Sequence, residues 1–262
     1  MRSSNPILNP KGFAADRTYG AGESMTIQGT VNKTFVLLAL VVLTASYVWG
    51  KVMQPAPVLD GFEQYGQSQS TAMQNVGPLM MLGVFGGFIA AIVTAFKKEW
   101  APITAPIYAA LEGLALGGIS AIFEASYPGI VMQAVALTFG TLFCLLVAYK
   151  TGLVQVTAKF RMGVFAATGA IALVYLVNMI MGFFGGGISM LSSSSPLGIG
   201  ISLVIVGIAA LNLVLDFDFI EQASSAGMPK YMEWYGAFGL MVTLVWLYME
   251  MLRLLAKMNN RR

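Results

Sequence analysis

Four acidic side chains lie inside long apolar stretches of this 262-residue sequence: Glu112, Asp216, Asp218 and Glu250. A carboxylate at the centre of a membrane helix costs about 2.5–3.5 kcal/mol on insertion scales, and such residues usually face a protein interior or a wet cavity. Burial raises the pKa of a carboxyl group, and a second carboxylate nearby raises one of the two further. Two such groups can then share one proton and titrate as a unit. The chemistry that these residues offer is therefore the binding of protons or cations.

Asp216 and Asp218 lie near the end of one apolar stretch. They are two positions apart, so they point about 200° apart on a helix and cannot form one site by themselves. Asp218 and the following Glu221 lie closer to a polar connection, and we interpret both as acids at the water interface. For Asp216, an interfacial acid and a buried acid both remain open.

Glu250 follows fifteen residues, 235–249, that carry no charge. Arg253 lies three positions later on the same helical face, so a local ion pair is one interpretation. Arg253 could instead extend to the membrane surface. We favour a functional role for Glu250, with Arg253 as a candidate counter-charge.

Glu112 lies in the middle of its apolar stretch, close to Gly113, Gly117 and Gly118. Small residues of this kind indicate that a second membrane helix approaches closely. We favour a structural interpretation, in which Glu112 bonds to a neighbouring helix, over a role in a pore.

The elements that must position these acids are membrane helices. The chain is 57% hydrophobic and 10% charged, whereas a soluble domain is about 45–50% apolar and about 25% charged. Seven apolar stretches approach or reach the length of about 20 residues that a membrane span needs. They cover residues 34–50, 77–96, 102–123, 129–149, 162–184, 197–219 and 235–255. We therefore predict an all-α polytopic membrane protein, with a flexible N-terminal arm at 1–33, one membrane domain at 34–258 and a basic tail at 259–262.

The distribution of Lys and Arg predicts the orientation, because cytoplasmic connections carry an excess of them. Most lie in the arm and in the second, fourth and sixth connections, whereas the odd-numbered connections contribute only Lys51. This pattern predicts a cytoplasmic N-terminus. The basic residues after the last stretch, Arg253 to Arg262, conflict with seven full spans, so the last helix either crosses despite its charge or is re-entrant.

Several classes of function have no support in the sequence. There is no histidine, which removes Ser-His-Asp hydrolysis and zinc sites that contain His. The lone Cys144 is interpreted as a small buried apolar residue. The net charge of +3, without a basic patch interleaved with aromatic residues, gives no indication of nucleic-acid binding. We predict neither an enzyme nor a bound cofactor.

Taken together, several motifs resemble those of the Bax inhibitor family (the transmembrane Bax inhibitor motif family) in its bacterial branch. The motifs are Met-Arg-Ser-Ser-Asn-Pro at 1–6, Leu-Glu-Gly-Leu at 111–114, Gly-Gly-Ile-Ser at 117–120, Asp216 with Ile220 four positions later, and Leu-Tyr-Met-Glu at 247–250. The resemblance covers nearly the whole pattern of spans. It implies seven helices with the last one central, and a location in the bacterial inner membrane.

The resemblance also implies a pH-sensitive calcium leak, gated by two acids of the last two spans that share a proton. On this sequence the pair is Asp216 and Glu250, which would also be transient calcium ligands. Glu250 stands where the family has Asp, and Asp218 adds an acid that the motif does not require. The basic latch of the family's second span has no counterpart here before Lys97.

Helix geometry argues against an easy contact between the two acids. Asp216 lies about 9 Å from the helical end near Gln222, whereas Glu250 lies about 22 Å past Tyr235, at 1.5 Å per residue. Glu112, about 15 Å into its own span by the same rise, matches Asp216 better in depth and is the rival partner.

Three functions remain open on the sequence. The first is a passive, proton-regulated calcium or cation conduit, closed when the acids are protonated. The second is a non-conducting protein that regulates other membrane proteins, such as a membrane protease, through its polar arm. The third is a proton-coupled transporter of an unknown solute.

Overall fold

The computed structural model describes residues 24–53 and 65–261, with side chains from residue 76 onward in the second range apart from Ser189 and Ser192. Its elements are α2 (Ile27–Val52), α3 (Tyr65–Phe96), the short 3-10 helix η2 (Lys98–Trp100), α4 (Ala101–Ser126), α5 (Ile130–Lys150), α6 (Ala158–Phe183), α7 (Ser189–Ser192), α8 (Pro196–Ser225) and α9 (Met232–Asn259). Seven of the described helices are long and apolar enough to cross a membrane, namely α2 to α6, α8 and α9. This confirms the predicted all-α polytopic fold.

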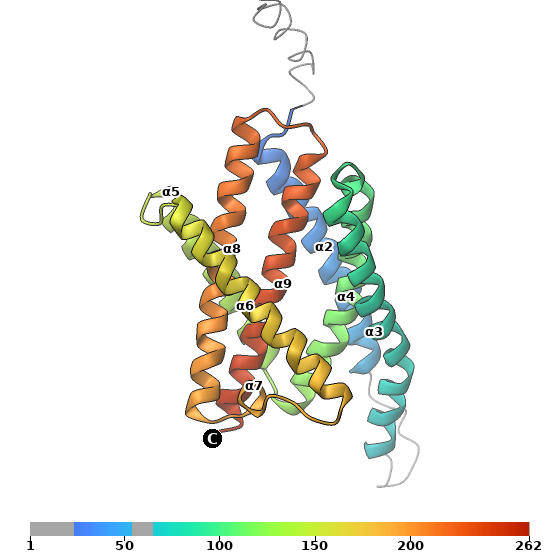
Figure 1. Cartoon of the computed structure of the whole chain (residues 1–262). Helices are drawn as coiled ribbons and strands as arrows, with labels where there is room; N and C mark the ends of the chain where they lie inside the picture. The colour runs from blue at the N-terminus through green and yellow to red at the C-terminus, as the bar shows by residue number, and fades with distance from the viewer. Residues whose placement is uncertain (1–23, 54–64, 262) are drawn as a thin grey trace, which may run out of the picture.

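The first and last spans begin at the same end of the bundle and run towards the opposite end, where the chain finishes (Figure 1). α9 has 28 residues, which is about 42 Å of helix and exceeds the roughly 30 Å of a hydrocarbon core. Its length therefore favours a full span over a re-entrant helix.

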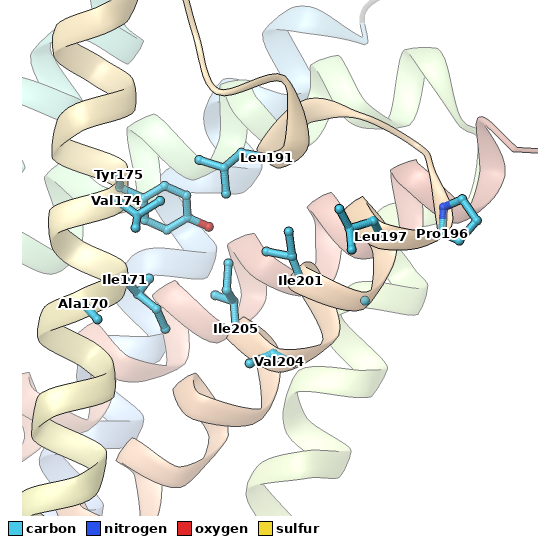
Figure 2. Close-up of a pocket in the computed structure, with 11 residues that line it drawn as sticks. Ala170, Ile171, Val174, Tyr175, Leu191, Pro196, Leu197, Ile201, Val204 and Ile205 are labelled. Carbon is cyan, nitrogen blue, oxygen red and sulfur yellow. The ribbon is translucent and has the colours of Figure 1, made fainter.

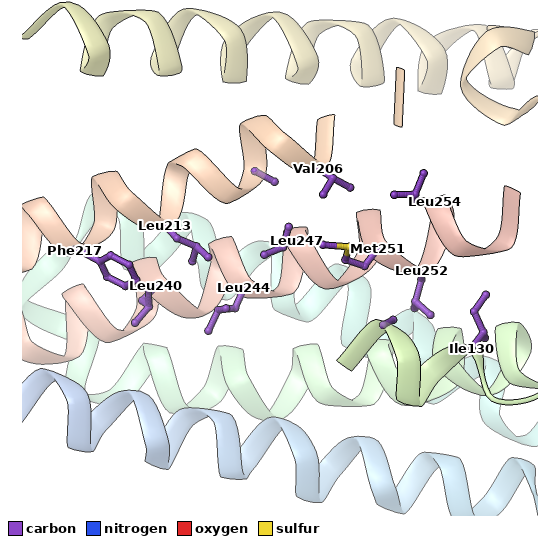
Figure 3. Close-up of a cluster of buried hydrophobic side chains, with 12 residues drawn as sticks. Ile130, Val206, Leu213, Phe217, Leu240, Leu244, Leu247, Met251, Leu252 and Leu254 are labelled. Carbon is purple, nitrogen blue, oxygen red and sulfur yellow. The ribbon is translucent and has the colours of Figure 1, made fainter. Parts of the chain in front are cut away.

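α9 is the central helix of the bundle, as predicted. It packs against α2, α4, α5 and α8. Figure 3 shows part of the resulting core, in which Leu213 and Phe217 of α8 lie against Leu240, Leu244 and Leu247 of α9. Asp216 of α8 and Glu250 of α9 therefore lie on the two helices that pack against each other along this core.

Glycines bring α2, α3 and α4 into close contact. A methyl group on Gly117 would lie 2.5 Å from the carbonyl oxygen of Ala45 in α2, and one on Gly83 would lie 2.6 Å from the carbonyl oxygen of Leu111 in α4. Such separations leave no room for a side chain. These three helices form a tightly packed half of the bundle.

α6 is packed quite differently. It runs obliquely across the outside of the bundle (Figure 1), contacts chiefly α8, and buries one side chain, that of Val164. Large apolar side chains such as Phe165 and Leu173 are more than half exposed. In a membrane this surface faces lipid, which is consistent with its apolar composition.

Two of the predicted domain boundaries and one side chain differ from the sequence-based expectations, and α3 and α8 are longer than their predicted spans, beginning at Tyr65 and ending at Ser225, respectively. α2 begins at Ile27, because the hydroxyl of Thr26 caps it by accepting from Gly29 N, so residues 27–33 belong to a helix and not to the predicted arm. Residues 1–23 lie outside the described part. α9 continues to Asn259, one residue into the predicted tail. Cys144 is exposed on α5, so its predicted burial was wrong: an apolar run does not reveal which helical face meets lipid.

Candidate functional site

Asp216 lies inside the bundle, between α8 and α9. Its Oδ1 is 3.9 Å from the position of a methyl group on Gly239, and the hydroxyl of Thr243 lies beside the carboxylate. Its Oδ2 is buried and has no hydrogen-bond partner among the described residues. The sequence left open an interfacial and a buried acid. The structure leaves Asp216 partly exposed as a residue but buries the Oδ2 of its carboxylate between α8 and α9.

Glu250 is also buried, with 1% of its surface exposed, but its carboxylate has partners. Its Oε1 accepts hydrogen bonds from the Tyr175 hydroxyl at 2.8 Å and from Arg253 Nη1 at 2.9 Å. The guanidinium of Arg253 lies over the ring of Tyr175, 5.2 Å from its centroid. Arg253 is therefore the counter-charge of Glu250, and the local ion pair that the sequence analysis ranked second is present.

The structure does not bring Asp216 and Glu250 together. Asp216 lies at the level of Gly239 and Thr243 on α9, and Glu250 is seven residues beyond Thr243, or about 10 Å along the helix axis. The two acids of the proposed pair therefore occupy different depths, as the rise along two antiparallel helices suggested. They are not positioned to share a proton directly, nor to ligate one calcium ion, whose oxygen ligands lie at about 2.3–2.6 Å.

The other two acids face other neighbours. Glu112 lies against α3, where its Oε2 would be 3.2 Å from a methyl group on Gly87, and beside Tyr108 of its own helix. Asp218 forms an ion pair with Arg161 at 2.6 Å and also accepts from Gln222. Neither arrangement provides a partner for Asp216. Within the described residues, no group of three or more Asp, Glu or Cys side chains is placed to hold a metal ion.

Polar contacts that the sequence analysis missed connect α6 with α8 and α9. Besides the Tyr175–Glu250 bond, Asn212 Nδ2 of α8 donates to Thr168 Oγ1 of α6 at 2.8 Å. Asn212 lies one helical turn before Asp216. The sequence did contain a signal for these contacts, because polar residues recur every seven positions in α6, at Arg161, Thr168 and Tyr175.

A second polar cluster, also missed, lies at the end of the bundle where α2 begins. Glu233 is completely buried and accepts from the backbone and the hydroxyl of Thr26, both at 2.9 Å, and from Lys33. The backbone also pairs here, since Met25 N donates to Met228 O at 2.7 Å. Residues 24–26 are thus tied to the turn between α8 and α9.

Comparison with known families gives one match. The profile of a family described as Bax inhibitor 1 like matches residues 5–260, which is nearly the whole chain. No curated protein and no solved structure matched the chain.

Proposed function

Because this chain belongs to the Bax inhibitor family, we propose that it is a pH-sensitive leak for calcium or a similar cation, and that Asp216 is its proton-binding switch. The carrying observation is the buried Oδ2 of Asp216, which lacks a partner in the described part of the chain. A buried acid without a counter-charge is costly in its ionised form. The described arrangement is therefore suited to the neutral, protonated carboxyl group.

Loss of the proton would place a charge between α8 and α9, next to Gly239, where the Thr243 hydroxyl is a hydrogen-bonding neighbour but no counter-charge is described. Water or a cation must then enter, or the two helices must separate. We propose that this demand opens the leak as the pH rises. Glu250 acts at a different depth, where its carboxylate would bind a cation once the contact with Arg253 is broken.

This proposal replaces direct proton sharing by two acids acting in sequence along the membrane normal. Asp216 would respond to protons, and Glu250 would contribute to cation binding. We also propose that the protein lies in a bacterial inner membrane with the α2 start in the cytoplasm. The grouping of Lys33 with Lys230 around Glu233 at that end supports this orientation.

Calcium flux into proteoliposomes, measured across a pH series, tests the proposal. We expect wild-type flux that rises with pH, a flat pH profile for Asp216→Asn, and reduced flux with retained pH dependence for Glu250→Gln. Glu99→Gln, which alters an exposed acid in η2, is the matched control and should behave as wild type. An unchanged pH profile in Asp216→Asn would contradict the assignment of the switch.

The regulatory alternative rests on a separate observation, the attachment of residues 24–26 to the α8–α9 turn. This attachment would connect the N-terminal arm with the two helices that hold Asp216. If purified protein passes no cation at any pH, while cells that carry Glu233→Gln lose the phenotype of the wild type, this alternative is favoured over the leak.

A further inference from the structure

Three residues of α6 hold it to the rest of the bundle, and they are spaced at seven-residue intervals: Arg161, Thr168 and Tyr175. Arg161 contacts Asp218, Thr168 accepts from Asn212, and Tyr175 donates to Glu250. Seven residues are close to two helical turns, so the three side chains form one stripe about 21 Å long. We call this set of three the α6 polar stripe. Because α6 runs obliquely, the stripe spans somewhat less than this length of the roughly 30 Å hydrocarbon core.

Apolar packing contributes little to the same interface. A groove of about 570 Å³ separates α6 from α7 and α8. Figure 2 shows Ile171, Val174 and Tyr175 of α6 on one side of this groove and Ile201 and Ile205 of α8 on the other. Over the length of this groove, α6 and α8 are therefore not in close apolar contact.

We infer that the interface of the α6 polar stripe with α8 and α9 is the route through which water and cations cross the membrane domain. This inference rests on the proposed leak and names the side chains that line it. Polar groups at membrane depth usually face a bundle interior or a water-filled cavity, and every member of the stripe pairs with a polar side chain of α8 or α9. When α6 moves outward, water molecules can form hydrogen bonds with each polar group of the stripe in place of its partner on α8 or α9.

Separation is easier at this interface than between α2, α3 and α4. Hydrogen bonds between membrane helices are individually weak, so three such contacts resist separation only modestly. The α2–α3–α4 contacts are closed by glycines that bring backbones together. A pocket of about 370 Å³ lies where α2, α4, α5 and α9 meet, and it is smaller than the groove beside α6. The route is also connected to the switch, because Asn212, the middle partner, lies four residues before Asp216 on α8.

Cysteine accessibility in proteoliposomes tests the inference. In a Cys144→Ser background, Thr168→Cys would be exposed to a membrane-impermeant, cationic methanethiosulfonate reagent. Leu173→Cys, on the lipid-facing side of the same helix and 63% exposed in the structure, is the matched control. A thiol reacts as the thiolate, which forms in water and not in hydrocarbon, so we expect Thr168→Cys to react at least about tenfold faster than Leu173→Cys at the pH of highest flux.

A second variant keeps the test decisive if Thr168→Cys fails to fold. Ile171→Cys lies in the groove on the stripe side and gives up no hydrogen bond, and it should also react faster than Leu173→Cys. Equal rates at 168, 171 and 173 would overturn the inference, even if the protein conducts calcium. Fast labelling at 168 and 171 without any calcium flux would leave the water route standing and reject the proposed leak.

Discussion

The hydroxyl of Tyr175 donates a 2.8 Å hydrogen bond to Oε1 of Glu250, and so joins the most peripheral span to the central one. Both partners also contact Arg253, through an ion pair and through the face of the aromatic ring. A buried acid on the central helix therefore depends on a side chain of a helix whose own surface is largely exposed.

Removing this hydroxyl should loosen α6 without disturbing the core. We expect Tyr175→Phe to lower the stability in detergent by about 0.6–1.7 kcal/mol, the range of inter-helix hydrogen bonds in membrane proteins. Tyr47→Phe, at a ring that is 57% exposed, is the control and should change little. Thermal unfolding followed by circular dichroism measures both. A Tyr175→Phe protein as stable as wild type would mean that Arg253 alone satisfies Glu250.

Asp216 should be a destabilising residue at neutral pH. Asp216→Asn removes a buried charge without changing the shape of the side chain, and we expect it to raise stability by about 1 kcal/mol or more. The gain should shrink as the pH is lowered, because the wild-type carboxyl is then neutral as well. Melting curves of both proteins over a pH series measure the difference. A gain that is the same at every pH would show that ionisation of Asp216 is not its cause.

Asp216 and Glu250 should act independently, since they lie at different depths. In a double-mutant cycle with Asp216→Asn and Glu250→Gln, we expect the free-energy changes for calcium flux to add within about 0.5 kcal/mol, as they do for separated sites. Flux in proteoliposomes at fixed pH provides the four values. A coupling larger than about 1 kcal/mol would restore the directly paired gate.

Close packing of α4 on α2 should make Gly117 intolerant of any side chain. A methyl group there would meet the carbonyl oxygen of Ala45 at 2.5 Å, and we expect Gly117→Ala to cost about 1–3 kcal/mol. Gly140→Ala on α5, where nothing lies within 4 Å, should instead be neutral or stabilise by up to about 1 kcal/mol. The midpoints of thermal unfolding of Gly117→Ala and Gly140→Ala, each compared with wild type, test this prediction. Similar values for both variants would place α2 farther from α4.

Glu233 should be needed for the ordered start of α2. We expect Glu233→Gln to cost about 3–5 kcal/mol, because it leaves the charge of Lys33 without its buried partner. Adding Lys33→Met to Glu233→Gln should recover part of this loss. Hydrogen exchange of the amides of residues 26–30 reports the local effect. Unchanged protection there in Glu233→Gln would assign the start of α2 to its Thr26 cap alone.

The spans could be predicted from the sequence because a membrane imposes one simple requirement, an apolar run of sufficient length. Their ends could not, because a helix continues into polar residues wherever its backbone remains bonded, as α2 does from Ile27 and α9 does to Asn259. The depth difference between Asp216 and Glu250 also followed from counting residues along each helix.

The partners of the candidate acids were beyond the reach of the sequence. Counting fixes the height of a side chain but not the direction in which its helix is rotated, and this rotation places Glu112 against Gly87 and Asp216 against Gly239. Tyr175 was overlooked because a lone tyrosine in an apolar span suggests nothing by itself. Its seven-residue spacing from Thr168 was the available signal.

The hydrogen bonds from residues 24–26 to the turn between α8 and α9 and to Glu233 would transmit a pulling force from the N-terminal part of the chain to these two helices. A force applied to the chain ahead of Ser24 would reach Met228 and Glu233 directly, before it could unwind α2. A partner that pulls on the chain ahead of Ser24 would therefore pull on the turn between α8 and α9, the two helices on either side of the Asp216 carboxylate.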